Sequence, residues 1–324
     1  MRAFLITENE SDFDAKVTDT ITEPVDQSDL KIKVEYSSIN FKDTMVAVPK
    51  SRVRRSPRLI GGVDASGEVV ASTDASFPVG AKVEVHGDGL GVSRDGGFAE
   101  FIYSPSRLAT ILPSNISTKD SQIIGTAGVT AAQSILALEN HGLKPGGEVL
   151  VTGATGGVGS LAVSLLAKRG YKPVASTGSP QESQWLLDQG AVRIIGRDEV
   201  TDKPDRVLGS ELWDGAIDCV GGETLANILR SLKYGAAVAA SGLLGGMDIP
   251  ATVYPFITRN VGLLGIDSVE ATPQTRAAAW KLISEANLDV SDLIDRIATL
   301  EELPEALGAV AKGATRGRIL VVPN

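Results

Sequence analysis

Residues 148–168 constrain the fold of this chain most strongly. There an apolar run, a glycine-rich turn and a helical pattern follow one another. Residues 149–151 are Val-Leu-Val, which is typical of a strand buried on both faces. Leucines recur at helical spacing over residues 161–166. The turn between the two patterns contains Gly153, Gly156, Gly157 and Gly159. The sequence therefore predicts a strand, a tight loop and a helix.

A glycine-rich turn in this position suits the phosphates of a dinucleotide. Glycine adopts positive φ in tight turns, and without a Cβ it lets a pyrophosphate approach the backbone. The amino end of the following helix offers unpaired N–H groups to that pyrophosphate. Plain turns between a strand and a helix also contain glycine, but here both flanking elements that the motif requires are present. We therefore predict a dinucleotide site.

The segment after the next expected strand favours NADP(H) over NAD. An NAD site usually places Asp or Glu about 20 residues further on, where it binds the ribose 2′-OH. Here that segment has no carboxylate and offers the small residues Ser176, Thr177, Gly178 and Ser179. The best positive partner for a 2′-phosphate is Arg197, at the end of an expected strand at 193–196. The alternative for Arg197 is a solvated charge paired with Asp198 or Glu199.

Composition limits the possible classes of protein. With 324 residues and 43% hydrophobic content, the chain is long enough for two domains. The net charge of -9 argues against nucleic acid as a partner, because such binding needs Lys and Arg to neutralise phosphates. We see no signal peptide and no run of about 18 apolar residues, so we expect a soluble cytoplasmic protein without a membrane partner. The single cysteine, Cys219, is expected in the core.

The order of the other patterns predicts an α/β fold with two domains. Up to about residue 120 the expected elements are all β-strands, at 2–7, 30–37, 67–71, 82–86 and 99–103, with a loop at 40–62. Strands and helices then alternate, which predicts a doubly wound parallel sheet. Its further strands are expected at 173–177, 193–196, 215–220, 236–241 and 263–267, and its helices at 131–139, 181–189 and 223–232. Helices at 273–286 and 300–312 and a strand at 317–322 are expected to return to the first domain.

The expected loop at 40–62 contains the most basic segment of this acidic chain. Its basic residues are Lys50, Arg52, Arg54, Arg55 and Arg58. Such a run is commonly a solvated surface. The functional alternative is a binding site for a polyanionic substrate, such as the phosphates of a CoA thioester, with Arg54 and Arg55 as substrate-binding residues.

Motifs over nearly the whole chain occur in a characteristic order. The β-domain is followed by Gly-Thr-Ala-Gly at 125–128, the glycine motif at 151–159 and a closing Gly-Arg at 317–318. This order resembles the medium-chain dehydrogenase/reductase superfamily. Within it, the chain is similar to the acryloyl-CoA reductase type of quinone-oxidoreductase-like protein. The similar segments are 37–43 (SSINFKD), 62–67 (GVDASG), 176–178 (STG), 197–199 (RDE) and 255–269 (PFITRNVGLLGIDSV).

The resemblance implies a GroES-like substrate domain over residues 1–120, completed by 270–324, and a Rossmann domain over 121–269. It also implies NADPH as cofactor, no zinc, and a homodimer, with residues 253–269 as a candidate interface by analogy. Catalytic zinc needs three protein ligands. Cysteine and histidine contribute only Cys219, His86 and His141, which also argues against a metal.

The resemblance further implies a set of cofactor contacts. They are Phe41, Thr155, Gly156, Gly157, Val158, Thr177, Gly178, Ser179, Arg197, Leu243, Ile266 and Arg318, and Ser176 joins them from the argument above. Family members commonly have Tyr where this chain has Phe41, and a basic residue where it has Ser179. The first change removes a hydroxyl that could orient the substrate. The second leaves Arg197 as the main partner for a 2′-phosphate.

The expected chemistry is hydride transfer from NADPH to the activated C=C bond of a small α,β-unsaturated acyl-CoA, such as acryloyl-CoA. Negative charge then builds on the carbonyl oxygen and must be stabilised. Asn40 and Lys42 are candidate donors, and Asp43 is expected to orient Lys42 or to join a proton relay. Alternatively, Asn40 caps a turn while Lys42 and Asp43 form an ion pair. The alternative functions are an NADPH:quinone oxidoreductase and a non-catalytic NADPH-binding redox sensor.

Overall fold

The computed structural model describes residues 1–22, 29–201 and 206–323 and divides the chain into two compact units. The first unit comprises residues 1–126, 269–277 and 289–324, and the second comprises residues 127–268 and 278–288.

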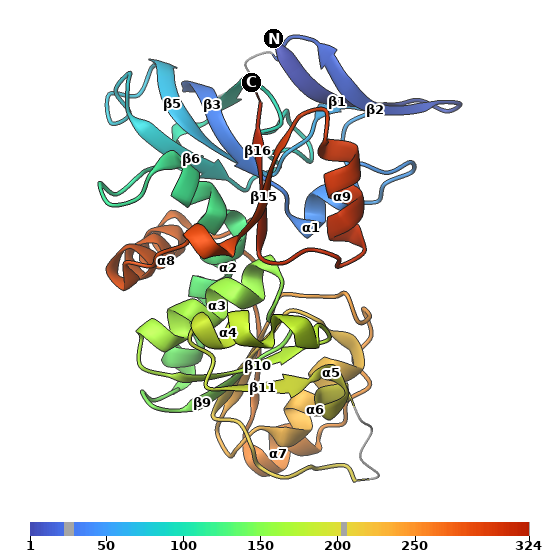
Figure 1. The fold of residues 1–324 in the computed structure, drawn as a ribbon, viewed down its shortest axis with the longest axis vertical. Coiled ribbons are helices and arrows are strands. Elements are labelled where there is room, and N and C mark those ends of the chain that lie inside the picture. The colour runs from blue at the N-terminus through green and yellow to red at the C-terminus, as the bar shows by residue number, and fades with distance from the viewer. Residues whose placement is uncertain (23–28, 202–205, 324) are drawn as a thin grey trace. The chain divides into compact units, whose positions relative to one another are not determined.

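The second unit is built on one parallel sheet (Figure 1). Its strands are β9 (Glu148–Val151), β10 (Lys172–Thr177), β11 (Arg193–Gly196), β12 (Gly215–Asp218), β13 (Ala237–Ala240) and β14 (Gly262–Gly265). They lie in the order β11-β10-β9-β12-β13-β14, and each neighbouring pair is parallel. The helices between them are α3 (Gly157–Lys168), α4 (Ser183–Asp188), α5 (Arg197–Thr201), α6 (Gly222–Ser231) and α7 (Tyr254–Arg259). This is the strand order of a Rossmann sheet, so the predicted doubly wound sheet is confirmed.

The core of the second unit includes side chains of the sheet and of α6. Leu150 and Val238 of the sheet cluster with Leu225, Ile228 and Leu229 of α6. The three α6 residues are spaced three and four apart, so they lie on one helical face. Each of these five side chains is almost fully buried, which stabilises the unit by about 1.5–3 kcal/mol per side chain.

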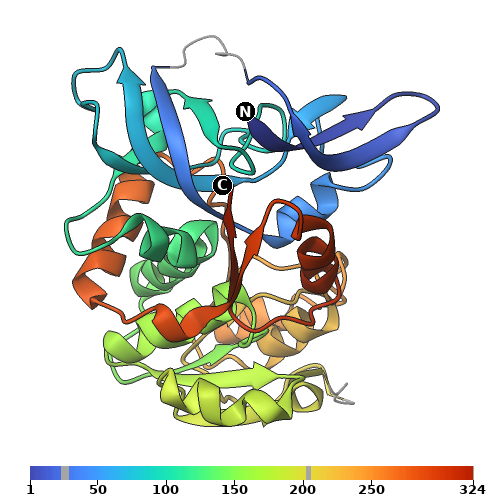
Figure 2. The ribbon, with the colours of Figure 1, turned by 45° about the horizontal axis from the view of Figure 1, so that its top comes forward.

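The first unit contains two sheets. The smaller is antiparallel, with β1 (Arg2–Glu8) between β2 (Phe13–Asp19) and β4 (Arg58–Ile60). Figure 2 shows β1 and β2 as a dark-blue hairpin. The larger sheet has the order β15-β16-β3-β5-β6-β8, and β7 also pairs with β3. Its strands are β3 (Leu30–Ser38), β5 (Asp64–Ser72), β6 (Lys82–His86), β7 (Phe101–Ser104), β8 (Ala109–Ile111), β15 (Ile294–Thr299) and β16 (Arg318–Val322).

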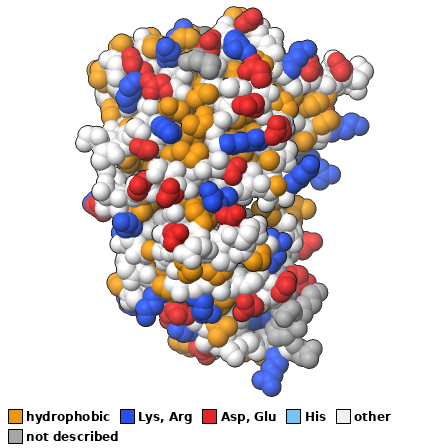
Figure 3. All heavy atoms as spheres, viewed as in Figure 1, with side chains coloured by type: hydrophobic (Ala, Val, Ile, Leu, Met, Phe, Trp, Pro, Cys, Tyr) orange, Lys and Arg blue, Asp and Glu red, His pale blue; other side chains and the backbone are white. Residues whose placement is uncertain are grey.

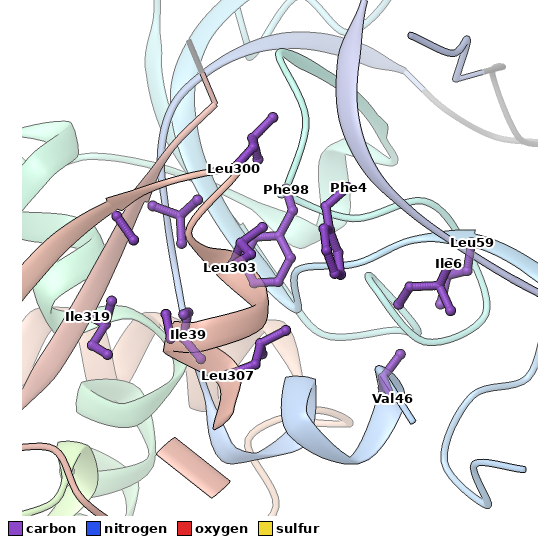
Figure 4. Close-up of a cluster of buried hydrophobic side chains, with 13 residues drawn as sticks. Phe4, Ile6, Ile39, Val46, Leu59, Phe98, Leu300, Leu303, Leu307 and Ile319 are labelled. Atoms are coloured by element: carbon purple, nitrogen blue, oxygen red, sulfur yellow. The ribbon is translucent and has the colours of Figure 1, made fainter. Parts of the chain in front are cut away.

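One apolar cluster of the first unit holds α1 (Phe41–Val46) and α9 (Leu303–Ala311) in place (Figure 4). Val46 of α1 belongs to the same cluster as Leu303 and Leu307 of α9. Phe4 of β1 completes it and packs edge-on against Phe98, with 6.4 Å between the ring centroids. The cluster fixes α1, which follows Asn40 and carries Phe41, Lys42 and Asp43.

The helix α2 (Thr118–His141) begins in the first unit and ends in the second. Its only non-helical residue is Gly125, whose φ of 49° divides the helix in two. By length and composition α2 could span a membrane, but most of its apolar stretch is buried inside the protein. It therefore fits a core helix.

Three sequence-based expectations need correction. Residues 40–62 are not one loop, because they contain α1 and β4; α1 is only six residues long and shows no apolar period. The strands β2, β8 and β15 were not expected, although Phe13, Ala15 and Val17 alternate along β2 as in a half-buried strand. The helix at 273–286 exists as α8 (Pro273–Ala286), but residues 278–288 belong to the second unit. Strand and helix periods do not reveal which unit a helix packs with.

Candidate functional site

The glycine-rich loop of the second unit has the predicted strand-loop-helix form. β9 ends at Val151, and α3 begins at Gly157 with Gly156 as its N-cap. Gly153 has a φ of 59°, in the left-handed region that favours glycine. A Cβ on Gly159 would lie within 2.3 Å of the Gly153 carbonyl oxygen. Two positions of this tight loop therefore require glycine. Gly153 needs it for its backbone conformation, and Gly159 needs it because a Cβ would collide with the loop backbone.

A pocket lies at the carboxyl ends of β9, β10 and β12, next to this loop. Its lining residues are Thr152, Gly153, Thr155, Ser176, Thr177, Gly178, Arg197, Val220 and Thr224. It therefore brings together five predicted cofactor-binding residues: Thr155, Ser176, Thr177, Gly178 and Arg197. None of these lining residues, all from the described part of the chain, is a carboxylate. The carboxyl edge of an open parallel sheet is where such folds bind ligands.

Hydrogen bonds shape the wall of this pocket. The hydroxyl oxygen of Thr177 accepts the Ser179 backbone N–H at 2.9 Å and lies 3.5 Å from the Thr155 hydroxyl. On the other side, the Asp218 carboxylate accepts the Thr152 hydroxyl at 2.6 Å and the Gly221 N–H at 2.8 Å. Burial raises the pKa of Asp218, while these hydrogen bonds oppose the shift. Asp218 therefore ties the end of β12 to the end of β9.

The other predicted cofactor residues of the second unit lie outside the pocket lining. Gly156, Gly157 and Val158 form the end of the loop and the first turn of α3. Leu243 is exposed in the segment after β13, and Ile266 follows β14, where its N–H bonds the Ala240 carbonyl at 3.0 Å. The sequence argument did not single out Thr152, Val220 and Thr224 for this pocket.

Cys219 follows β12 directly and is partly exposed as a residue. Burial raises the pKa of its thiol to about 12, and the neighbouring Asp218 adds to the shift. The thiol is therefore protonated at neutral pH, which fits the expected core role better than a nucleophile.

The first unit contains a buried polar cluster centred on Asp64, the first residue of β5. Its carboxylate accepts the Ser38 hydroxyl at 2.9 Å, the Asn40 side-chain amide at 2.8 Å and the Thr126 backbone N–H at 3.1 Å. Arg318 lies 3.9 Å away as a buried counter-ion. Neither Ser38 nor Asp64 is among the site residues expected from the sequence. An acid among the small and uncharged residues of segment 62–67 was the available signal, because acids are almost never fully buried unless paired.

Arg318 is a predicted cofactor contact, but its guanidinium already donates hydrogen bonds to other residues of the first unit. It donates to the Ser38 hydroxyl at 2.6 Å, to the Ile123 carbonyl at 3.1 Å and to the Asn40 amide oxygen at 3.3 Å. Burial lowers its pKa, and the charges of Asp64 and Asp43 oppose that shift. The structure thus gives Arg318 the role of holding Asn40 and Ser38.

Asp43 is buried in α1, and both of its oxygens accept backbone N–H groups. The partners are Asn40 at 2.7 Å and Val63 at 3.0 Å. Burial raises the pKa of Asp43 to about 8, with the Asp64 charge adding to the shift. The expectations that Asp43 orients Lys42 or pairs with it need correction, because Asp43 is held by the backbone instead. Asn40 is the N-cap residue of α1 and directs its side-chain amide at Asp64, not at an external acceptor.

Of the two predicted substrate-binding arginines, Arg54 is structural. It is buried, donates to the Val46 carbonyl at 2.6 Å and forms an ion pair with Glu8. Its guanidinium also lies 5.5 Å from the ring centre of Phe13. The substrate-binding prediction for Arg54 is therefore wrong, since its guanidinium is enclosed by the first unit. Arg55 is exposed.

Comparison with known proteins identifies the class. A family model described as alcohol dehydrogenase GroES-like domain matches residues 26–114, and one described as zinc-binding dehydrogenase matches residues 157–285. YhfP of Bacillus subtilis, named as a quinone oxidoreductase, is 44% identical over 99% of this chain and 98% of its own length. The acrylyl-CoA reductase AcuI of Ruegeria pomeroyi is 41% identical over 91% of this chain and 90% of its own.

Two solved structures have the same fold along the whole chain. Escherichia coli YhdH with bound NADPH has a TM-score of 0.94 at 37% identity, covering 99% of this chain and 100% of that one. Bacillus subtilis YhfP with NAD bound also has a TM-score of 0.94, at 44% identity, covering 99% and 98%. The chain therefore belongs to the medium-chain dehydrogenase/reductase superfamily of oxidoreductases. Within it, the chain falls in the quinone-oxidoreductase-like branch that contains YhfP and AcuI.

The residues do not fit the zinc in the name of one family model. Over residues 1–22, 29–201 and 206–323, the structure groups no three His, Cys, Asp or Glu side chains where they could hold a metal ion. His86 is buried with its Nδ1 2.5 Å from Glu84, and Cys219 has a protonated thiol at neutral pH.

Proposed function

We propose that this protein is an NADPH-dependent reductase that transfers hydride to the activated C=C bond of a small α,β-unsaturated acyl-CoA, such as acryloyl-CoA. The cofactor choice rests on the pocket at the end of β10, whose described lining residues include Arg197 and no carboxylate. A carboxylate there would repel a 2′-phosphate, whereas Arg197 attracts it. The relationship to AcuI supports the substrate class.

In this proposal the glycine loop, including Gly156, Gly157 and Val158, binds the pyrophosphate. Thr155, Ser176, Thr177, Gly178, Ser179 and Arg197 hold the adenosine ribose and its phosphate, while Phe41, Leu243 and Ile266 contact the nicotinamide half. When bound, NADPH supplies the hydride. Lys42, which is partly exposed on α1, donates toward the carbonyl oxygen as negative charge builds there.

The buried cluster supports Lys42 indirectly. Asp64 and Arg318 fix Asn40, and Asp43 closes the first turn of α1 by accepting the Asn40 N–H. The backbone of residues 40–43 is thereby held before substrate arrives, which is what electrostatic stabilisation of a developing charge requires. Exposed Arg55 binds the phosphates of the CoA moiety.

The test measures the loss of NADPH absorbance with acryloyl-CoA and a simple quinone offered separately at matched concentrations. We expect the thioester to be preferred by orders of magnitude in kcat/KM, and Lys42→Met to lower kcat for the thioester with little change in the KM for NADPH. Preference for the quinone would establish the second candidate, a quinone reductase, which the name of YhfP and the Phe at position 41 favour. NADPH binding without turnover of either compound would indicate a redox sensor.

We also propose a cytoplasmic homodimer formed through the β14 side of the second unit. β14 ends the sheet order, so its outer edge is available to pair with another strand. Exposed apolar side chains recur along residues 243–263, which lead into β14: Leu244, Met247, Val253, Tyr254, Ile257 and Leu263. A second copy would cover them about a twofold axis. On the face in Figure 3, acidic and basic side chains are interspersed, with apolar side chains gathered between them.

A further inference from the structure

The side chain of Arg197 lies directly over Gly178. β10 ends at Thr177, so Gly178 is the first residue beyond the strand, and Arg197 begins α5. A Cβ added to Gly178 would lie 2.5 Å from Nη2 of Arg197, 2.7 Å from Cζ and 3.0 Å from Nε. These distances are too short for non-bonded atoms. The guanidinium therefore occupies the space that any other residue at 178 would fill.

The backbone at position 178 does not itself require glycine. Gly178 is not among the residues with positive φ, whereas Gly153 and Gly170, in the same unit, are. An L-residue can adopt the conformation of Gly178 without backbone strain. The three atoms nearest to an added Cβ belong to the Arg197 guanidinium, the far end of a flexible side chain. An alanine would therefore fit once the guanidinium moved away.

We propose that Gly178 is a specificity-determining residue: its missing side chain makes room for the Arg197 guanidinium in the pocket beside Ser176 and Thr177, where it binds the 2′-phosphate of NADPH. Gly178 acts through Arg197 and is thus a positioning residue. This inference rests on the proposed role of Arg197. Among the residues that the structure describes, Arg197 is the only cationic side chain in the pocket lining, and position 179 carries serine. The described lining therefore offers no second cation to replace a displaced Arg197.

The experiment compares NADPH and NADH binding to the purified protein and its Gly178→Ala variant by fluorescence titration. We expect the Kd for NADPH to rise about tenfold, as for the loss of a charge-assisted hydrogen bond, and the Kd for NADH to stay within about twofold. In steady-state assays the KM for NADPH should rise while kcat stays unchanged. The matched control is Gly308→Ala in α9, where an added Cβ meets no atom within 4 Å. It should change neither Kd.

Arg197→Ala separates this inference from the proposed function. If Arg197→Ala leaves the Kd for NADPH unchanged, the phosphate role of Arg197 fails, and with it the inference. If Arg197→Ala weakens NADPH binding about 10- to 100-fold but Gly178→Ala does not, only the role of Gly178 is overturned. An equal loss of NADPH and NADH binding in Gly178→Ala would also overturn it, because the methyl group would then obstruct both cofactors.

A double variant gives a second check. Gly178→Ala and Arg197→Ala act on the same guanidinium, so the combined variant should bind NADPH no more weakly than Arg197→Ala alone. Additive losses would show that Gly178 contributes by a route other than Arg197. The unfolding transition of Gly178→Ala should lie at or slightly above that of the parent protein, since Gly→Ala at an unstrained position is not destabilising.

Discussion

The carboxyl group of Asp43 is buried away from water, and it accepts two hydrogen bonds from backbone N–H groups. The hydrogen bonds from Asn40 and Val63 favour the charged form, but burial and the nearby Asp64 oppose it more strongly. The result is a pKa of about 8 in place of the usual value near 4. The only neighbouring cation, among the groups that set this pKa, is Arg318.

This shift predicts a pH-dependent stability. Between about pH 4 and pH 8 the folded protein retains the Asp43 proton while the unfolded chain has lost it, so the folded state binds more protons. Stability therefore falls as pH rises through this window, by up to about 1.4 kcal/mol per pH unit for this group. Asp43→Asn removes the titration. Urea unfolding at several pH values should show a flatter dependence for the variant, and parallel curves would contradict the argument.

At the scale of elements, Arg54 fastens the C-terminal end of α1. Its guanidinium donates to the carbonyl of Val46, the last residue of α1, and to the carbonyl of Val48, two residues further on. Glu8 of β1 neutralises the charge. A basic side chain in this position satisfies the carbonyl groups that a helix leaves unpaired at its C-terminus. Arg54 thus links α1 to the smaller sheet.

We therefore expect Arg54→Ala and Arg55→Ala to behave differently. Arg54→Ala should lower the free energy of unfolding by about 2–4 kcal/mol, because it takes a hydrogen-bond donor from two carbonyl groups and the counter-ion from Glu8. Arg55→Ala should change it by less than about 0.5 kcal/mol, as expected for an exposed site, but should raise the KM for acyl-CoA and not for a quinone. Chemical denaturation and steady-state kinetics measure the two effects. Equal losses of stability would refute the distinction.

At the scale of the whole molecule, the apolar surface along residues 243–263 predicts self-association. Ile257 is 72% exposed and Met247 is 84% exposed, which is costly for an isolated chain. Light scattering should give twice the 33.8 kDa of one chain, and Ile257→Glu together with Leu263→Lys should shift the protein toward monomers. Val79→Lys is the control, because Val79 is also exposed, at 65%, but lies in the first unit. A parent protein that stays monomeric at high concentration would contradict the proposed dimer.

The amino-acid sequence alone determined those features of this protein that depend on residues adjacent in the chain. The Val-Leu-Val strand, the glycine loop and the α3 leucines follow from periods and from glycine, so the Rossmann sheet and the pocket residues at its edge could be predicted. The absence of a carboxylate after β10 is likewise a property of a few consecutive residues, and it already favoured NADP(H).

Only the tertiary structure decided which charges are buried and what they contact. Arg54 and Arg55 are adjacent and chemically identical, yet one is enclosed by residues 8, 13 and 46 and the other faces solvent. Asp43 next to Lys42 suggested an ion pair, but Val63 and Asn40 bind that carboxylate, and Arg318 from the far end of the chain joins the cluster. The free energy of a charged group depends on burial and on partners that lie far away in sequence. That information is absent from local pattern and appears only when the chain is folded.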